Sequence, residues 1–281
     1  MYGSRRATTW WCGAVRLDDV RGFVFDIDGS LVHRGADFRA RPLPGAVSVL
    51  EAIRASGRPL VLFTNGSHMG PAAFAGGLRE SGLPVKDDEV LTPVCSALSY
   101  LARRHPGRPA MVFGSDATRE RMAAAGVPLV DGEDAEVVFV AHVDSVELSA
   151  MEVAARAVMN GARLLTANYL RGFWGADGII FSRGAMVTAG IARVTGARPI
   201  VVGKPSRAAV DEISERLGVP SEQTAVIGDD IGMDIALGHL GRSRTVLVRS
   251  GMSGKVDLDG IPERRRPHAV VDGVEEILGW L

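Results

Sequence analysis

The stretch Phe23-Val24-Phe25-Asp26-Ile27-Asp28-Gly29-Ser30 decides the fold of this chain. Its apolar residues predict a buried strand, and residues two apart in a strand project from the same face. Asp26 and Asp28 can therefore converge on one ligand while Ile27 packs on the other side. Gly29 lets the backbone turn close to whatever binds there. An Asp-x-Asp-Gly stretch can also be a surface turn, so the prediction of a site depends on the rest of the chain.

Three further apolar runs end in polar residues that suit phosphate chemistry. Short β-branched runs alternating with helical stretches predict a parallel sheet, and open parallel sheets bind ligands at the carboxyl ends of their strands. We therefore expect all four polar clusters on one edge of one sheet. The three runs with their clusters are Pro59–Phe63 with Thr64-Asn65-Gly66-Ser67, Pro199–Val202 with Gly203-Lys204-Pro205-Ser206, and Thr224–Ile227 with Gly228-Asp229-Asp230 and, further on, Asp234.

Composition limits the class of protein. The 281 residues suffice for one large domain or a domain with an insert. Lys and Arg total 32 against 33 Asp and Glu, so no broad field attracts nucleic acid or an anionic membrane. Cys12 and Cys95 offer neither a disulfide framework nor metal-ligand spacing. No apolar run approaches the ~20 residues that span a bilayer, so we expect a soluble, cytoplasmic protein. Residues 1–18, which include Arg5-Arg6, are interpreted as a leader strand or frayed arm.

The order of apolar patterns predicts an α/β fold in two parts. Residues 1–106 and 198–281 are expected to form a parallel-sheet core, and residues 107–197 an α/β insert with its own strands and helices. Because the insert lies between the Thr64 and Lys204 clusters, we expect it to form a lid over the site. The expected helices cover residues 46–56, 71–80, 93–103, 117–124, 147–160 and 184–196.

The acidic residues match what phosphate ester cleavage requires, which is an in-line nucleophile, charge neutralisation and a proton for the leaving oxygen. Asp26 can attack phosphorus to form an aspartyl phosphate, and Asp28 can protonate the leaving oxygen and later activate water. Asp229 can join Asp26 in holding Mg²⁺, without which the carboxylates and the phosphate would repel one another. The acidic residues beyond Asp229 are expected to cap a helix or to support the ligands from behind, and they are Asp230 and Asp234.

The remaining predicted groups bind the phosphate. Thr64 can cradle phosphate oxygens together with the backbone N–H groups of Asn65 and Gly66. Lys204 can supply a fixed positive charge to the same site and is counted with the catalytic residues. These residues predict a phosphate-binding site only when they are taken together, because a single strand-end Thr or a single Lys is most often structural or solvated.

Four motifs in order give the chain a family resemblance over nearly its whole length. The chain resembles the haloacid dehalogenase-like (HAD) phosphatases of subclass IIA, the group of p-nitrophenyl phosphatases, phosphoglycolate phosphatase and NagD-like nucleotide phosphatases. The resemblance implies a Rossmann-like core, a large α/β cap formed by the insert, Mg²⁺ as cofactor and a possible homodimer. It also implies nucleophile Asp26, acid/base Asp28 with a backbone metal contact, and side-chain metal ligand Asp229. The matching stretches are Asp26–Ser30, Thr64–Ser67, Gly203–Ser206 and Gly228–Asp234, with Pro42–Ala46 and Ser250-Gly251 in support.

The cap departs from the family pattern. Relatives often carry an Asn-Pro-Asp stretch facing the substrate, whereas this chain has Asn168-Tyr169-Leu170, of which Asn168 is interpreted as a substrate-binding residue. His142 stands in a stretch where relatives commonly have Gly-Phe-Asp, and it is either a substrate contact or a packed or surface histidine.

The prediction is a Mg²⁺-dependent phosphomonoester hydrolase for a small phosphorylated metabolite such as a sugar, polyol, nucleotide or phosphoglycolate. Two alternatives stay open. One is a phosphotransferase or mutase that uses the same intermediate, and the other is a non-catalytic binding or regulatory protein that keeps the fold.

Overall fold

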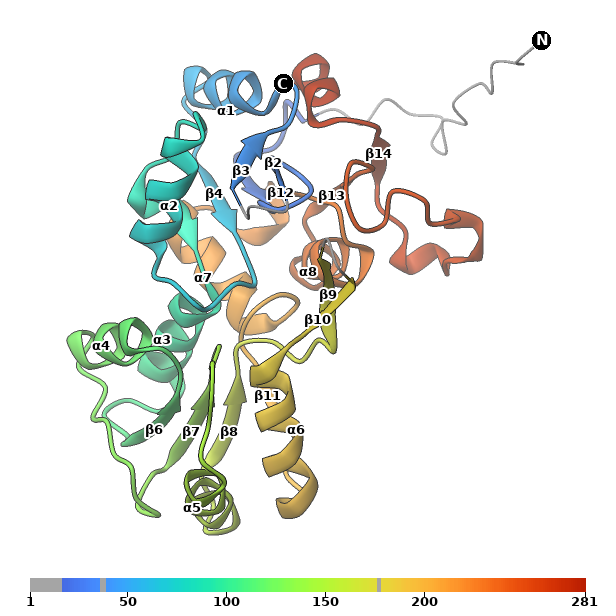
Figure 1. The fold of residues 1–281 in the computed structure, drawn as a ribbon. Helices are drawn as coiled ribbons and strands as arrows, with labels where there is room; N and C mark the ends of the chain where they lie inside the picture. The colour runs from blue at the N-terminus through green and yellow to red at the C-terminus, as the bar shows by residue number, and fades with distance from the viewer. Residues whose placement is uncertain (1–16, 36–38, 176–177) are drawn as a thin grey trace.

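Two parallel sheets occupy two halves of the molecule (Figure 1). The computed structural model describes residues 17–35, 39–175 and 178–281. The arm expected at residues 1–18 therefore lies outside the described residues, apart from its last two. Leu17 is fully buried, and its N–H donates to the carbonyl of Trp280 over 3.2 Å, so the chain enters the core at this point.

The larger sheet has six parallel strands in the order β14-β13-β12-β1-β4-β5. Strand β1 (Gly22–Phe25), the apolar run before Asp26, lies at the centre between β12 (Thr224–Gly228) and β4 (Leu60–Phe63). Every residue of these three strands is buried, as expected for strands covered on both faces. The outer strands are β5 (Val90–Leu91), β13 (Arg244–Val248) and β14 (Ala269–Val271).

Helices cover both faces of this core sheet. On one face, residues of α1 (Ala46–Ala55) and α2 (Pro71–Glu80) pack in one cluster with Phe23 and Phe25 of β1. On the other face, residues of α7 (Arg207–Leu217) pack against Val24. The remaining core elements are α8 (Ala236–Gly241) and the short helical turns η1 (Asp87–Glu89), η2 (Ser221–Gln223), η3 (Ile231–Ile235), η4 (Leu258–Gly260), η5 (Glu263–Arg265) and η6 (Val274–Trp280).

The smaller sheet, here called the cap sheet, has four parallel strands in the order β11-β8-β7-β6. Helices α5 (Leu148–Met159) and α6 (Arg183–Thr195) pack on one face of it, and α3 (Pro93–Arg104) and α4 (Asp116–Ala124) contribute to the cluster on the other. The six helices predicted from sequence are confirmed, each within about two residues at its ends. The strands are β6 (Ala110–Phe113), β7 (Val137–Val140), β8 (Arg163–Thr166) and β11 (Ile200–Val201).

The prediction of one sheet for all four apolar runs is wrong for the third run. Ile200 and Val201 pair with β8 in the cap sheet instead of joining the core sheet. The physical reason is that a two-residue apolar strand fits the edge of either sheet, and packing decides which one it joins. The chain then crosses to the core after Val202, and the N–H of Gly203 donates to the carbonyl of Ala167 over 3.0 Å.

Two antiparallel strand pairs were not predicted. Strands β2 (Val32–Arg34) and β3 (Ala40–Pro42) pair directly after the loop that carries Asp28. Strands β9 (Gly172–Gly175) and β10 (Gly178–Phe181) form a hairpin that projects from the cap toward the core half in Figure 1. None of the helices in the described residues has the length and apolar character that a membrane span requires.

Candidate active site

Three buried or half-buried carboxylates meet at the carboxyl ends of the two central strands. Asp26 follows β1, Asp229 follows the neighbouring β12, and Asp234 comes from η3, one turn further on. One oxygen of each carboxylate lies within 4.8 Å of the others. The pairing of β1 with β12 therefore brings together acids that are about 200 residues apart in the sequence.

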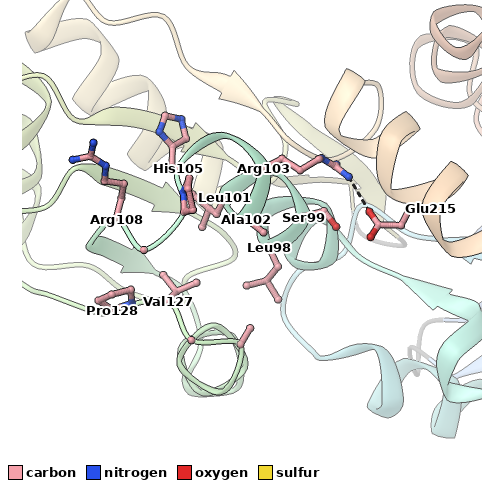
Figure 2. Close-up of a pocket in the computed structure, with 14 residues that line it drawn as sticks. Leu98, Ser99, Leu101, Ala102, Arg103, His105, Arg108, Val127, Pro128 and Glu215 are labelled. Carbon is pink, nitrogen blue, oxygen red and sulfur yellow. Dashed lines mark hydrogen bonds and ion pairs between the residues drawn. The ribbon is translucent and has the colours of Figure 1, made fainter.

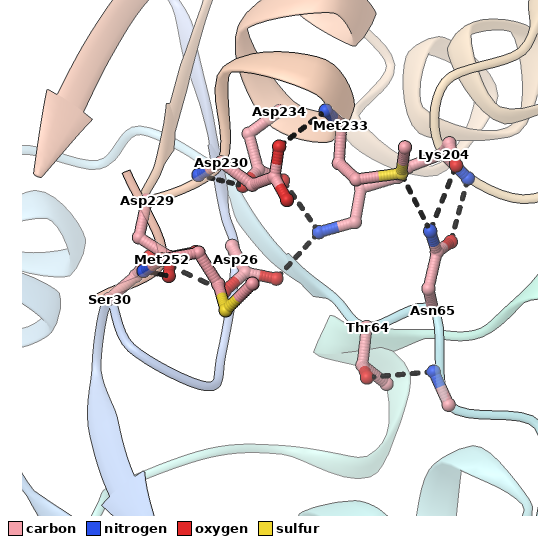
Figure 3. A network of polar contacts seen from close by, with 11 residues as sticks. Asp26, Ser30, Thr64, Asn65, Lys204, Asp229, Asp230, Met233, Asp234 and Met252 are labelled. Atoms are coloured by element: carbon pink, nitrogen blue, oxygen red, sulfur yellow. Dashed lines mark hydrogen bonds and ion pairs between the residues drawn. The ribbon is translucent and has the colours of Figure 1, made fainter. Parts of the chain in front are cut away.

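Lys204 joins this acidic group from the chain that crosses over from the cap. Figure 3 shows its Nζ between Asp26 and Asp234, to which it donates over 2.6 Å and 2.7 Å. Burial acts to lower the pKa of this ammonium, but the two carboxylates outweigh it and hold the pKa of Lys204 above its ordinary value. The side chain, only 3% exposed, is therefore a fixed positive charge.

The carboxylates carry more negative charge than one ammonium offsets. Burial, followed by the charges of Asp26 and Asp234, raises the pKa of Asp229 to about 8. Burial also raises the pKa of Asp234 to about 6 and raises that of Asp26, in both cases against the opposing effect of Lys204. Three clustered oxygen donors with surplus negative charge suit a hard divalent cation such as Mg²⁺. The donor set thus fits the metal expected from the sequence.

Glycines let two loops close around Asp229. The N–H of Met252 donates to its Oδ2 over 2.6 Å, and a Cβ on Gly251 would lie 2.6 Å from its Cγ. Gly29 has a φ of 90°, and a Cβ there would lie 2.9 Å from the same Cγ. Ser250 Oγ donates to the Gly29 carbonyl over 2.6 Å and joins the two loops. A side chain at either Gly29 or Gly251 would push the Asp229 carboxylate aside.

The acidic group found among the described residues does not include Asp28. Its side chain is 47% exposed and accepts a hydrogen bond of 2.5 Å from Nε of Arg34 in β2. The charged partner orients the carboxyl at the rim of the site, where a proton could be passed to a leaving group. Sequence reasoning missed Arg34, because the β2–β3 pair that carries it has no strong strand pattern.

The loop after β4 connects to Lys204 through its Asn side chain. Asn65 Nδ2 donates to the Lys204 carbonyl over 2.8 Å, and the Lys204 N–H donates to Asn65 Oδ1 over 2.7 Å. Thr64 Oγ1 accepts the Gly66 N–H over 3.0 Å, so one N–H expected to cradle phosphate is engaged by Thr64. The sequence pointed to the backbone of Asn65, whereas the structure adds a side-chain role in holding Lys204 in place.

Asp230 and Asp234 organise the π-helical turn η3. Asp230 Oδ1 accepts the N–H groups of Gly232 and Met233 over 2.6 Å and 3.1 Å and so caps the turn. Asp234 Oδ2 accepts the N–H of Asp230 over 3.1 Å, while its other oxygen binds Lys204. Asp234 therefore lies in the acidic group itself, where it also binds Lys204.

The cap reaches the site at two places. Ser67 Oγ accepts the N–H of His142 over 3.0 Å, which joins the loop after β4 to the end of β7. Asn168 follows β8, where its Oδ1 accepts a hydrogen bond of 3.1 Å from Ser182 at the start of α6. Tyr169, the next residue, has 47% of its side chain exposed. No contact of Asn168 with the acidic group is recorded in the described residues.

The two described cavities lie elsewhere. The larger, about 480 Å³, opens between α3 and residues 125–128, which follow α4 (Figure 2), and the smaller, about 300 Å³, borders it near Cys95. Glu215, a carboxylate of the larger cavity, is already paired with Arg103 over 2.8 Å. Neither cavity is lined by a residue of the acidic group, so the candidate active site at the strand ends is separate from both cavities.

Comparison with known proteins gives matches along nearly the whole chain. Two family models match, haloacid dehalogenase-like hydrolase over residues 23–128 and HAD-hydrolase-like over residues 201–277. The chain is 32% identical over 261 residues to the ribonucleotide monophosphatase NagD of Escherichia coli strain K12, covering 92% of this chain and 98% of that protein. It is 27% identical over 255 residues to the dihydroxyacetone phosphatase of Corynebacterium glutamicum strain R, covering 91% and 90%. The solved p-nitrophenyl phosphatase from Archaeoglobus fulgidus superposes with a TM-score of 0.83 at 29% identity, covering 94% of this chain and 100% of that one.

Proposed function

Because the chain belongs to the haloacid dehalogenase-like hydrolases, within the NagD-like phosphatases of subclass IIA, we propose that it is a Mg²⁺-dependent phosphomonoesterase. The observation that carries this proposal is Asp26, which lies at the end of the central strand, bonded to Lys204 and grouped with Asp229. The relatives are named for ribonucleotide monophosphates, dihydroxyacetone phosphate and p-nitrophenyl phosphate, which supports a small phosphorylated compound as substrate.

The proposed reaction uses Asp26 as the nucleophile. One of its carboxylate oxygens attacks the phosphorus atom, the bond from phosphorus to the ester oxygen breaks, and an aspartyl phosphate forms. Asp28 gives its proton to the departing oxygen, and its half-exposed position two residues after the nucleophile supports this role. In the second step Asp28 takes a proton from water, whose oxygen attacks phosphorus, and phosphate leaves while the Asp26 carboxylate is regenerated.

The side chains of Asp26 and Asp229, with the backbone carbonyl of Asp28, are the proposed ligands of Mg²⁺. The bound ion would supply positive charge against the oxygens of the transferred phosphoryl group. The surplus negative charge of the acidic group supports this assignment. Asp234 binds Nζ of Lys204 and so orients it, and we propose this, not metal binding, as its main task.

Phosphate binding is proposed for the loop after β4 and for Lys204. The Thr64 hydroxyl and the Asn65 N–H are donors at the carboxyl end of β4, beside the nucleophile strand. Lys204 has its charge next to Asp26, where the phosphoryl oxygens would approach. The Asn65 side chain donates to the Lys204 carbonyl and accepts from the Lys204 N–H, so it fixes the position of Lys204 relative to the loop after β4. Asn168 is proposed to face the substrate from the cap, with its side-chain oxygen held by Ser182.

A phosphate-release assay tests the proposal. The purified protein should hydrolyse p-nitrophenyl phosphate and members of a panel of sugar, nucleotide and three-carbon phosphates, lose activity in EDTA and regain it with Mg²⁺. Asp26→Asn should abolish turnover with an unchanged melting temperature, because the amide is nearly isosteric but cannot attack phosphorus. Loss of the nucleophile should cost several kcal/mol, each ~1.36 kcal/mol being about tenfold in rate. Full activity of the metal-free protein, or wild-type kcat for the variant, would contradict the proposal. Comparing released phosphate with released alcohol separates hydrolysis from transfer to another acceptor.

A further inference from the structure

Two histidines lie side by side where the cap meets the loop after β4. The rings of His68 and His142 have centroids 5.8 Å apart and planes inclined at 69°. His68 Cε1 is 3.5 Å from the place where a Cβ of Gly66 would stand, so its ring borders the proposed phosphate loop. The N–H of His142 is fixed on Ser67 Oγ over 3.0 Å. The pair thus belongs half to the core and half to the cap.

Both rings can still bind a ligand. His68 is exposed, and in the part of the chain that the structure describes its ring nitrogens have no hydrogen-bond partner. The side chain of His142 is 38% exposed, and its Nε2 has only a long contact of 3.4 Å with Asp144. An edge-on contact of 5.1 Å between the ring centroids of Phe74 and His68 holds the His68 ring in place. Of the four ring nitrogens of the pair, only Nε2 of His142 has a partner in the described residues, so the others are available to a ligand.

Charged groups of both signs lie near the pair. Burial lowers the pKa of His68, and the charges of His142 and Arg34 lower it further, against a smaller opposing effect of Asp144. Arg183 also binds the Asp144 carboxylate, over 2.9 Å, and so offsets part of its negative charge. An anion beside His68 would find imidazole N–H donors and the positive charge of Arg34, which also binds Asp28, whereas the nearby carboxylates Asp28 and Asp144 each already bind an arginine.

We propose that His68 and His142, with Arg34 beside them, form a subsite for a second anionic group of the substrate. The preferred esters would then carry a carboxylate or a second phosphate on the carbon skeleton, in addition to the phosphate that is cleaved. The inference rests on the proposed function, since it places this subsite next to the Asp28 carboxyl that protonates the leaving group. Discrimination would come from the subsite, and the acidic group would cleave any ester that binds.

Matched esters test the subsite. The pairs are 3-phosphoglycerate with glycerol 3-phosphate, which differ by a carboxylate, and fructose 1,6-bisphosphate with fructose 6-phosphate, which differ by a phosphate. The wild-type enzyme should prefer the anionic member of one pair by about tenfold in kcat/KM, the size expected for a charge-assisted hydrogen bond. The pair that shows the preference identifies the second anion.

Variants locate that preference. His68→Ala and His142→Ala should each lower kcat/KM for the preferred ester about tenfold more than for the partner that lacks the second anionic group or for p-nitrophenyl phosphate. His68→Gln keeps an N–H donor and should restore part of the preference. His105→Ala, at the end of α3 beside the larger cavity, is the matched control and should leave the ratio unchanged.

Each contrary outcome has a separate meaning. If the enzyme hydrolyses p-nitrophenyl phosphate but prefers neither anionic member, the subsite is refuted and the proposed phosphatase function stands. The same holds if the folded histidine variants lower kcat/KM equally for all esters. If no ester is hydrolysed with Mg²⁺ present, the proposed function and the subsite both fall.

Discussion

Replacing Gly251 by alanine should disable the metal site without unfolding the protein. The added methyl carbon would lie 2.6 Å from Cγ and 2.8 Å from Cβ of Asp229, whereas non-bonded carbon atoms normally lie about 3.5–4.0 Å apart. The carboxylate must therefore withdraw by roughly 1 Å from its place beside Asp26. The loop cannot move away instead without losing the hydrogen bond from the Met252 N–H to Asp229.

The expected cost follows from that displacement. A misplacement of about 1 Å in a catalytic group can cost about a hundredfold in rate, which corresponds to about 2.7 kcal/mol. We expect Gly251→Ala to lower kcat/KM for p-nitrophenyl phosphate by this amount and to need more Mg²⁺ for half-maximal activity. Both quantities come from one steady-state titration with Mg²⁺, and the melting temperature should stay near that of the wild type.

Gly77→Ala provides the control. Gly77 lies in α2, and no atom lies within 4 Å of the position that an added methyl carbon would take. Alanine there should therefore keep full activity and stabilise the helix by about 0.5–1 kcal/mol. A Gly251→Ala protein that matches this control in kcat/KM and in Mg²⁺ requirement would refute the assignment of Asp229 as a metal ligand held by the two loops.

Three further predictions concern other residues. Asn65→Ala should lower kcat about tenfold, because Lys204 loses two backbone hydrogen bonds, and an unchanged kcat would show that Lys204 is held by other contacts. Tyr169→Ala should raise KM for the physiological ester more than it changes kcat/KM for p-nitrophenyl phosphate, and equal effects on all substrates would remove this exposed residue from substrate selection. Burial raises the pKa of the Glu212 carboxyl above its ordinary value of 4.5, so the folded protein keeps this proton to a higher pH than the unfolded chain does. The contribution of Glu212 to the free energy of unfolding is therefore fully present below pH 4.5 and is lost as pH rises through the folded-state pKa. Glu212→Gln should therefore lose less free energy of unfolding than the wild type as pH rises above 4.5 in urea titrations, and parallel curves would contradict this.

Local patterns were enough to predict most helices and the central strands. Pro71 opens α2 and Pro93 opens α3, and both signals are visible in the sequence. The fully apolar run Phe23–Phe25 suits only a strand covered on both faces. Asp26 and Asp229 could be expected together because each follows such a run, and parallel pairing then brings their ends to one edge.

Two of the features missed from the sequence depend on distant segments. The sheet to which Ile200–Val201 belongs is decided by the availability of β8 and not by the run itself. The two-way bond between Asn65 and Lys204 joins residues 139 apart. Asp234 enters the acidic group through a π-helical turn, a rare geometry that no local pattern announces. The β9–β10 hairpin did have a local signal, an Asp-Gly pair between apolar runs, that could have been used.

The large separation in sequence between Asp26 and Lys204 also affects how the chain folds while it is being synthesised on the ribosome. The two residues are 178 apart, and β12, the neighbour of β1, is made later still. At about 5–20 residues per second, roughly ten to forty seconds pass between the synthesis of the two charges. During that interval β1 is an apolar strand with one side unpaired, open to chaperones and to neighbouring nascent chains. The strand that precedes the proposed nucleophile is thus exposed to misassembly during synthesis, and slowing translation of the cap should prolong that exposure.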